Sequence, residues 1–403
     1  MKYVVFLGDG MADLPFEGLG GATPLDCVRH PAMDALARGG LLGLAKTVPD
    51  GMPAGSDVAN LSVFGYDPRR YYTGRSPLEA VSMGIDLAPE DVTYRCNFVT
   101  LSDAPRLEDA VMDDYSAGEI STEEARELVA LLNEHFETPH ERLYPGISYR
   151  HCFVRRGAAD GAILTPPHDI SKRAVREYLP RGEHAELMLS LMRQAYAVLR
   201  DHPVNRARAA RGVPVANCVW FWGEGRKPAL TPFHDAFGLR GSVISAVDLI
   251  QGIGKCAGLR VLHVPGATGN YHTDFAAKGR AAIDALRGGD DFIYLHVEAP
   301  DECGHRREVR EKVWSIEQID AHIIAPVMAW LDASGEDYAV LLMPDHPTPL
   351  ELMTHTAAPV PFALYRKGGI GNGASAYTEA CAAQTGLYIE HAHELMRLLS
   401  GTN

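Results

Sequence analysis

The sequence predicts an α/β fold with a mainly parallel central sheet flanked by helices. Short apolar runs bounded by Gly, Asp or Pro alternate with longer amphipathic stretches along most of the chain. That alternation is typical of strands joined by crossover helices. The chain has 403 residues, of which 46% are hydrophobic and 22% charged. This globular composition is long enough for a large core and a second domain.

The first strand illustrates how the elements are identified. Residues 3–7 are uniformly apolar and are stopped by Gly8 and Asp9. On the same grounds we expect strands over residues 3–7, 41–48, 94–100, 215–221, 260–264, 291–297, 338–343 and 361–365. The longer amphipathic stretches predict helices over residues 31–38, 122–134, 183–200, 242–251, 273–286, 307–331 and 391–399.

The segment from 104 to 214 differs from the rest of the chain. It lacks acids placed directly after strands, it contains a run of charged helix formers at 121–127, and it ends in a polar, basic stretch at 205–212. We therefore predict a core domain formed by 1–103 and 215–403, with 104–214 inserted as a smaller α+β domain that binds substrate.

Charge and cysteine content narrow the classes of partner. A formal net charge of -14 argues against nucleic acid, whose binding surfaces are strongly basic, but leaves small anionic substrates open. The seven cysteines are scattered singly without a C-x-x-C pair, which favours a reducing compartment and a cytoplasmic protein. No apolar run approaches the length of a membrane span, so no membrane partner is expected.

Ser56 lies between Gly55 and Asp57 and has two interpretations. Its side chain could cap the N-terminus of a helix. Alternatively, the free N–H groups and positive end of that helix could stabilise an alkoxide and a phosphate on the same hydroxyl.

Acidic and histidine side chains follow several of the predicted strands. The set is Asp9, Asp301, His305, Asp345, His346 and His355. Each alone is more often a loop acid or a surface histidine. In open α/β sheets, however, sites form at the carboxyl ends of strands, where these residues would converge. Mixed carboxylate and imidazole ligands suit divalent cations. The D-x-x-x-H spacing of Asp301 and His305 places both on one side of a helical turn, or lets a loop containing Gly304 fold both back onto one ion.

Five separated motifs carry a family resemblance. These are residues 8–10 (GDG), 55–57 (GSD), the Asp301 and His305 pair, 345–346 (DH) and His355. In this order they resemble the cofactor-independent phosphoglycerate mutases of the alkaline phosphatase superfamily. Length and the stretches 74–80, 94–98 and 167–170 are similar to the shorter, archaeal-type branch.

The resemblance implies an alkaline phosphatase-like core and an isomerase of glycolysis. It implies one divalent ion on Asp9, Ser56, Asp345 and His346, and a second on Asp301, His305 and His355. Manganese is the expected metal, with magnesium or zinc as alternatives. Ser56 would take the phosphoryl group from 3-phosphoglycerate as a phosphoserine, and the 2-hydroxyl of the reoriented glycerate would take it back.

Binding of this small phosphorylated substrate needs anion-binding side chains. The candidates are Arg75, Arg95, Asn97, His168 and Asp169. Guanidinium groups bind phosphate and carboxylate in bidentate fashion. Lys172 and Lys278 are interpreted as surface lysines.

Other functions remain open on the same metal core. A homoserine kinase-like phosphotransferase would differ only in donor and acceptor, and a phosphomonoesterase would let water reach the phosphoserine. A non-enzymatic metal protein fits less well, because structural zinc favours closely spaced cysteines and needs no serine.

Overall fold

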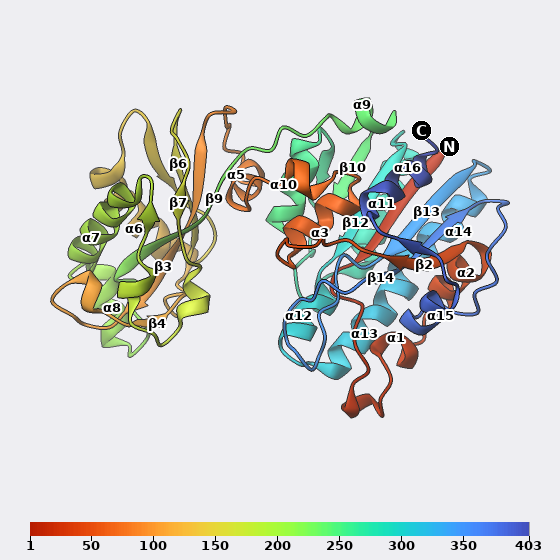
Figure 1. Ribbon diagram of the computed structural model, residues 1–403, viewed down its shortest axis with the longest axis horizontal. Coiled ribbons are helices and arrows are strands. Elements are labelled where there is room, and N and C mark those ends of the chain that lie inside the picture. The colour runs from red at the N-terminus through yellow and green to blue at the C-terminus, as the bar shows by residue number, and fades with distance from the viewer. Residues whose placement is uncertain (403) are drawn as a thin grey trace. The chain divides into compact units, whose positions relative to one another are not determined.

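The computed structural model describes residues 1–402 and divides into two compact units (Figure 1). Unit 1 comprises Met1–Tyr72 and Ala229–Asn403, and unit 2 comprises Thr73–Pro228. The boundaries predicted from the sequence, after residues 103 and 214, fall elsewhere. Strands β3 (Val92–Leu101) and β9 (Cys218–Arg226) pair with each other inside the sheet of unit 2, so both belong to that unit.

Unit 1 is built on an eight-stranded sheet with the order β11-β10-β12-β1-β13-β14-β2-β15. The strands are β1 (Lys2–Gly8), β2 (Leu41–Ala45), β10 (Gly241–Ile244), β11 (Arg260–Leu262), β12 (Phe292–Val297), β13 (Tyr338–Met343), β14 (Val360–Arg366) and β15 (Tyr388–Ile389). The first five in spatial order run parallel, whereas β14 is antiparallel to both of its neighbours. The predicted mainly parallel α/β sheet is confirmed.

Helices of unit 1 connect these strands. They are α1 (Pro24–Cys27), α2 (Pro31–Gly39), α3 (Ser56–Val63), α4 (Pro68–Tyr71), α9 (Phe233–Phe237), α10 (Asp248–Cys256), α11 (Phe275–Arg287), α12 (Ala299–His305), α13 (Val309–Ile319), α14 (Ala325–Ala333), α15 (Glu379–Gln384) and α16 (Leu395–Ser400). Figure 1 shows them lying against both faces of the sheet.

Alternation along the central strands sends side chains to both layers. On one face, Phe6, Ile293 and Leu342 share a buried cluster with apolar residues of α2, α11, α13 and α14. On the other face, Tyr294 stacks on Phe64, directly after α3, with ring centroids 3.8 Å apart. Because the central strands are buried on both faces, their sequences are continuous apolar runs.

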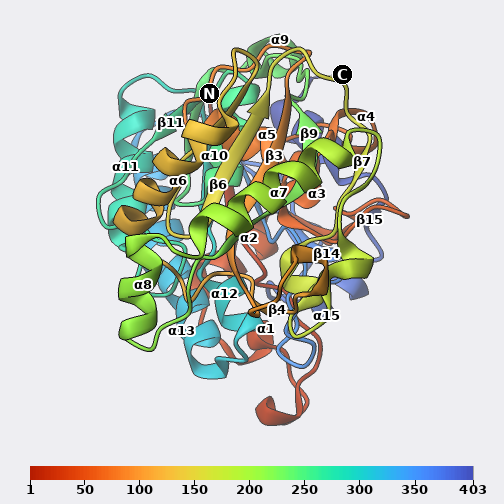
Figure 2. The same ribbon diagram turned by 90° about the vertical axis from the view of Figure 1, so that its left-hand side faces the viewer.

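Unit 2 has its own antiparallel sheet, in which β3 pairs with β4, β6 and β9 and β5 pairs with β6. Its remaining elements are β4 (Met112–Asp114), β5 (Glu141–Tyr144), β6 (Arg150–Arg155), the β7 (Ala162–Ile163) and β8 (Arg181–Gly182) pair, α5 (Ser76–Ser82), α6 (Thr122–Phe136), α7 (Ala185–Leu199) and α8 (Pro203–Ala210). Figure 2 shows α6 and α7 across β3 and β6. Tyr94, Cys96 and Phe98 of β3 pack in one core with Leu128 of α6 and Met188 of α7.

Two helix predictions require correction. Residues 242–251 are not one helix, because β10 occupies Gly241–Ile244 and α10 begins only at Asp248. The apolar run at 241–244 forms a buried parallel strand, which periodicity alone does not distinguish from a buried helix segment. The predicted helix 307–331 is interrupted by a π-helical turn at Asp320–Ile324, before Pro326 in the first turn of α14.

No helix within residues 1–402 combines the length and apolar character needed to cross a bilayer.

Candidate active site

Three neighbouring parallel strands of unit 1 deliver the acidic ligand candidates. Strands β12, β1 and β13 are adjacent in the sheet. Asp9 follows β1, Asp301 lies in α12 just after β12, and Asp345 follows β13. Because the strands are parallel, their carboxyl ends meet at one edge, and all three carboxylates are buried there. The convergence that the sequence predicted is therefore present.

Ser56 is the first residue of α3, but it does not cap that helix. The N-cap residue is Gly55, in extended conformation, so the Ser56 side chain lies one position too late for the capping role. Its hydroxyl instead lies 3.1 Å from Nε2 of His346. The side chain is half-buried at the positive end of the helix, where an alkoxide or phosphate is stabilised.

One group of ligand atoms consists of Asp9, Asp345 and His346, all within 4.8 Å of one another. His346 Nε2 lies 3.2 Å from Asp345 and 3.7 Å from Asp9. Oδ1 of Asp9 is buried and has no hydrogen-bond partner in the described chain. A buried carboxylate oxygen without a donor is costly in a protein interior, so the group fits a cation among these three residues.

The second group consists of Asp301, His346 and His355. His305 lies outside that set but contacts two of its members, at 3.2 Å from Asp301 and 2.8 Å from His355. His305 and Asp301 are four residues apart on α12, as the D-x-x-x-H spacing predicted. His346 belongs to both groups, whereas the family resemblance assigned it to one ion only.

Burial dominates the electrostatics of these residues. It raises the pKa of Asp9, and the negative charges of Asp345 and Asp301 raise it further. Burial acts in the same direction on Asp301, but hydrogen bonds from His305 and His355 outweigh it and lower that pKa. Burial lowers the pKa of His346, which keeps its imidazole neutral and able to bind a metal. A divalent cation bound among several buried carboxylates would offset the repulsion between their negative charges.

Close backbone packing holds the site together. Gly10 has φ +60, and a Cβ there would lie 2.6 Å from Cα of Asp301 and from Oγ1 of Thr348. Thr348 itself hydrogen-bonds Asp301. Lys312 is fully buried and donates to Asp13 at 2.6 Å and to the Thr348 carbonyl at 2.8 Å. The loop between His346 and His355 is thereby anchored to α13 and to the turn after β1.

Asn60 is a supporting residue that sequence reasoning missed. Its amide nitrogen donates to the Ser56 carbonyl at 2.9 Å and to Asp345 at 2.8 Å, and its oxygen accepts from the Tyr294 hydroxyl at 2.7 Å. One buried amide thus ties the serine helix to a carboxylate 285 positions away. The i, i+4 spacing from Ser56 was the available signal.

His296 and Lys278 were also missed. His296 in β12 lies 2.9 Å from Oδ2 of Asp9 and 3.2 Å from Ser245. Because the carboxylate can only accept, Nε2 of this neutral imidazole donates and Nδ1 accepts from Ser245. Lys278, expected at the surface, is instead fully buried and donates to the His296 carbonyl at 3.3 Å. Burial lowers its pKa to about 8.

The five predicted substrate-binding residues all lie in unit 2. Arg75 and Arg95 meet the Glu79 carboxylate, at 2.8 and 2.9 Å respectively. Burial acts to raise the pKa of Glu79, but the two arginines lower it, so the carboxylate stays charged. Burial lowers the pKa of Arg95 to about 10. Of the two guanidinium groups, Arg95 is the more buried.

Asn97 and His168 share the Trp222 ring with Arg95, whereas Asp169 contacts His168 and is mostly exposed. Arg95 and Asn97 alternate along β3 with the core residues Tyr94, Cys96 and Phe98, so they occupy its other face. His168 and Asp169 lie in the 3-10 turn Pro167–Ile170, with 3.6 Å between them. The Asp169 side chain is 59% exposed.

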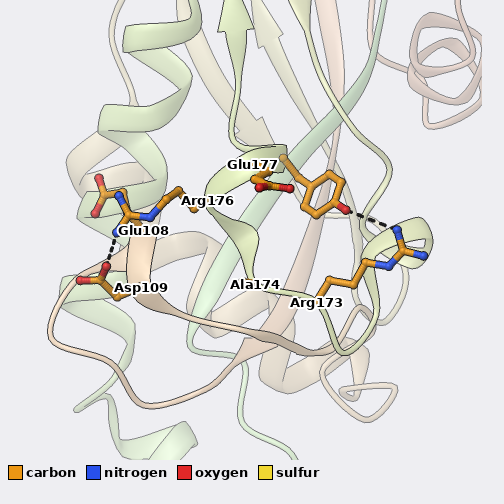
Figure 3. A pocket seen from close by; sticks show the side chains of 7 residues that line it. Glu108, Asp109, Arg173, Ala174, Arg176 and Glu177 are labelled. Atoms are coloured by element: carbon orange, nitrogen blue, oxygen red, sulfur yellow. Dashed lines mark hydrogen bonds and ion pairs between the residues drawn. The ribbon is translucent and has the colours of Figure 1, made fainter.

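A surface hollow in unit 2 has no part in this arrangement. It measures about 590 Å³ and is lined by residues of the 3-10 turn Leu107–Asp109 and of the segment 173–178, among them Asp109, Arg173 and Arg176 (Figure 3). Arg176 pairs with Asp109, and Arg173 donates to the Tyr178 hydroxyl at 3.3 Å. None of the predicted site residues lines it.

Solved structures similar to this chain define its class of fold. A protein of Pyrococcus horikoshii, PH0037, has a TM-score of 0.81 and 29% identity over 100% of this chain and 98% of its own. The cofactor-independent phosphoglycerate mutase of Thermoplasma acidophilum has a TM-score of 0.67 at 24% identity, over 100% of this chain and 99% of its own. The chain is therefore an α/β protein of the fold that this mutase adopts.

Sequence relatives identify the family. Residues 37–205 match the family described as 2,3-bisphosphoglycerate-independent phosphoglycerate mutase. Proteins of that name from Methanothrix thermoacetophila and Methanosarcina acetivorans are 50% and 49% identical, over 99% and 91% of both chains respectively. The chain belongs to the family of 2,3-bisphosphoglycerate-independent phosphoglycerate mutases, which are isomerases, and the predicted resemblance is confirmed.

Proposed function

We propose that this protein interconverts 3-phosphoglycerate and 2-phosphoglycerate through a phosphoserine at Ser56. The observation that carries the proposal is the position of the Ser56 hydroxyl: at a helix N-terminus, free of any capping bond, and 3.1 Å from His346 within a buried group of metal-ligand type. The names of the relatives support the substrate.

In the proposed reaction, Ser56 Oγ attacks the phosphorus of 3-phosphoglycerate. As Oγ attacks it gives up its proton, the bond from phosphorus to the substrate's 3-oxygen breaks, and that oxygen takes up a proton. After the glycerate reorients, its 2-oxygen loses its proton and attacks the phosphoserine, the bond from phosphorus to Oγ breaks, and Oγ takes up a proton again. The free N–H groups at the start of α3 stabilise charge on the phosphoryl oxygens during both transfers.

We also propose that two divalent ions occupy this site, with manganese first and magnesium or zinc as alternatives. Asp9, Ser56, Asp345 and His346 would hold one ion and Asp301, His305 and His355 the other; the shared contacts of His346 and the unpartnered oxygen of Asp9 support such binding. When bound, such ions lower the pKa of the serine hydroxyl and screen the phosphate charge. His296 and Asn60 orient Asp9 and Asp345 for this role.

In unit 2 we propose that Arg75, Arg95, Asn97, His168 and Asp169 bind the substrate. The charge and burial of Arg95 support this role, since a desolvated guanidinium binds carboxylate or phosphate strongly. Asp169 has the weakest structural support, because it is exposed. The seven free cysteines support a cytoplasmic location.

The test is turnover of 3-phosphoglycerate by the purified chain, coupled to enolase, with Ser56→Ala beside wild type. We expect Ser56→Ala to lose activity by at least about 10⁴-fold, as loss of a covalent nucleophile does. Acid-quenched wild type should yield a phosphorylated peptide containing Ser56. Ser62→Ala, on the same helix, is the matched control because its hydroxyl bonds the Thr47 carbonyl and faces the interior.

Persistent turnover in Ser56→Ala would exclude the covalent route. Turnover of homoserine with a phosphate donor, without turnover of phosphoglycerate, would instead support a homoserine kinase-like phosphotransferase. Release of inorganic phosphate without 2-phosphoglycerate would indicate a phosphomonoesterase.

A further inference from the structure

Trp222 of β9 contacts three of the five predicted substrate-binding residues. The guanidinium carbon of Arg95 lies 4.1 Å from the centre of its ring. Its indole N–H donates to Oδ1 of Asn97 at 3.0 Å. The imidazole of His168 meets the same indole edge-on, with ring centres 5.3 Å apart. Glu79 also contacts Arg95, and Tyr115 contacts Asn97 and His168, but within residues 1–402 Trp222 is the residue that contacts all three side chains.

The indole limits the orientation of the Arg95 side chain. A guanidinium on an aromatic face lies in a preferred plane, and the contact with Glu79 at Nε fixes its rotation within that plane. Within residues 1–402 the two terminal nitrogens of Arg95 make no hydrogen bond, and its contact with Glu79 is at Nε. That fork of donors therefore matches a carboxylate or a phosphate, which Arg binds through two parallel hydrogen bonds.

The same indole determines which way the Asn97 amide faces. An indole N–H can only donate, so the amide atom next to it must be the oxygen. The amide nitrogen then points the other way, where it donates to the Tyr115 carbonyl at 3.2 Å. Asn97 therefore presents a donor and not an acceptor on the side away from Trp222, as an anion site requires.

His168 is held between two aromatic rings. Besides Trp222, the Tyr115 ring lies edge-on to it with centres 6.1 Å apart. His168 lies in a single short 3-10 turn, where its side chain also contacts Asp169 at 3.6 Å, and the two ring contacts hold the imidazole against β9 and Tyr115.

We propose that Trp222 is a positioning residue for a small-anion site in unit 2, where it orients Arg95, Asn97 and His168 toward a carboxylate or phosphate group. The proposal rests on the substrate-binding role proposed for those three residues. Trp222 acts through them and has no part in the bond-making steps at Ser56.

The experiment combines tryptophan emission with steady-state kinetics of the full chain. The variants are Trp222→Leu, which removes the aromatic face and the N–H, and Trp222→Phe, which keeps an aromatic face and removes only the N–H. We expect 3-phosphoglycerate to change wild-type emission and Trp222→Phe to lose most of that change. The KM should rise about tenfold in Trp222→Leu and less in Trp222→Phe, because one cation–π contact and one hydrogen bond correspond to about that factor. The kcat should stay within about twofold, since the lost interaction is the same in ground and transition states.

Phe221→Leu is the matched control on the same strand. Phe221 is paired with Cys96, so it lies on the opposite face of the sheet from Arg95 and Asn97, and its ring packs in the core 5.2 Å from that of Phe153. We expect this variant to keep the wild-type KM and emission response. A KM rise in Phe221→Leu equal to that in Trp222→Leu would make the effect one of general stability and overturn the proposal. So would a folded Trp222→Leu with wild-type KM.

Titrations with D-glycerate and with inorganic phosphate separate the two anion sources and keep this inference distinct from the mutase proposal. If wild type fails to turn over phosphoglycerate, the mutase proposal fails alone. Either anion that changes emission in wild type and not in Trp222→Phe would still support the site. A wild-type emission unaffected by all three ligands would overturn it.

Discussion

Replacement of Asn60 by leucine tests how the serine helix is tied to the acidic cluster. Leucine has similar size but no polar atoms, so the variant removes hydrogen bonds without leaving a large cavity. Three bonds are lost: to the Ser56 carbonyl, to Asp345 and from Tyr294.

The stability effect follows from the groups left unpartnered. Asp345 and the Tyr294 hydroxyl are buried, and each buried polar group without a partner costs about 1–3 kcal/mol, more for a charged one. The local stability of α3 should therefore fall by at least about 3 kcal/mol. Loss of a partner that orients Asp345, a proposed metal ligand, should also reduce kcat by about 10–100-fold.

Hydrogen exchange of peptides that cover α3 measures the first effect, and the enolase-coupled assay measures the second. Ser62→Ala is the control, because it removes one buried hydrogen bond from the same helix. We expect it to lower the local stability of α3 by about 1 kcal/mol and to leave kcat unchanged. If the hydrogen-exchange protection of α3 is the same in Asn60→Leu as in Ser62→Ala, and Asn60→Leu keeps the wild-type kcat, then the Asn60 amide has no positioning role.

Three further predictions concern metal, backbone space and pH. Exhaustive chelation should abolish turnover of 3-phosphoglycerate and added Mn²⁺ should restore it; activity that survives chelation would contradict the two-ion proposal. Gly10→Ala should lose at least about 100-fold in activity, because its Cβ would lie 2.6 Å from Asp301 and the backbone has φ +60. Gly51→Ala is the control, since Gly51 also has a positive φ but has open space around it. Equal losses of activity in the two variants would refute the steric explanation. Burial lowers the pKa of His151 from 6.5 to about 3, so the folded state favours the neutral imidazole. Below pH 6.5 the unfolded chain binds a proton that the folded chain does not. The free energy of unfolding should therefore fall by about 1.4 kcal/mol per pH unit between pH 6.5 and about pH 3. Hydrogen exchange of β3 and β6 should show a shallower loss in His151→Asn than in wild type, with exposed His135→Asn as control; identical pH profiles would contradict this cause.

The positions of the ligand candidates were predictable because they depend on strand polarity. Asp9, Asp301 and Asp345 each follow a short apolar run, and parallel strands align their carboxyl ends whatever the length of chain between them. The i, i+4 relation of Asp301 and His305 is likewise a local property of a helix.

Burial and domain boundaries were harder to predict because they depend on distant segments. Lys278 was expected at the surface, yet the sheet and its neighbouring helices enclose it. The strand at 241–244 was read as helix because a buried parallel strand has no alternating pattern. The unit boundaries differ from the predicted ones because β3 pairs with β9, more than a hundred residues further along the chain. No local change in composition marks that pairing.

By itself, then, the sequence determined the α/β class and the family, and it supplied the residues proposed for phosphoryl transfer, since residue type and strand order are local properties of the chain. The tertiary structure alone decided which of them share a site atom by atom. It showed that Ser56 faces His346 and is no cap, that His346 joins both ligand groups, that Asn60 bridges to Asp345, and that Trp222 gathers Arg95, Asn97 and His168. Those contacts join segments far apart along the chain, and only the folded packing of strands and helices brings them within bonding distance.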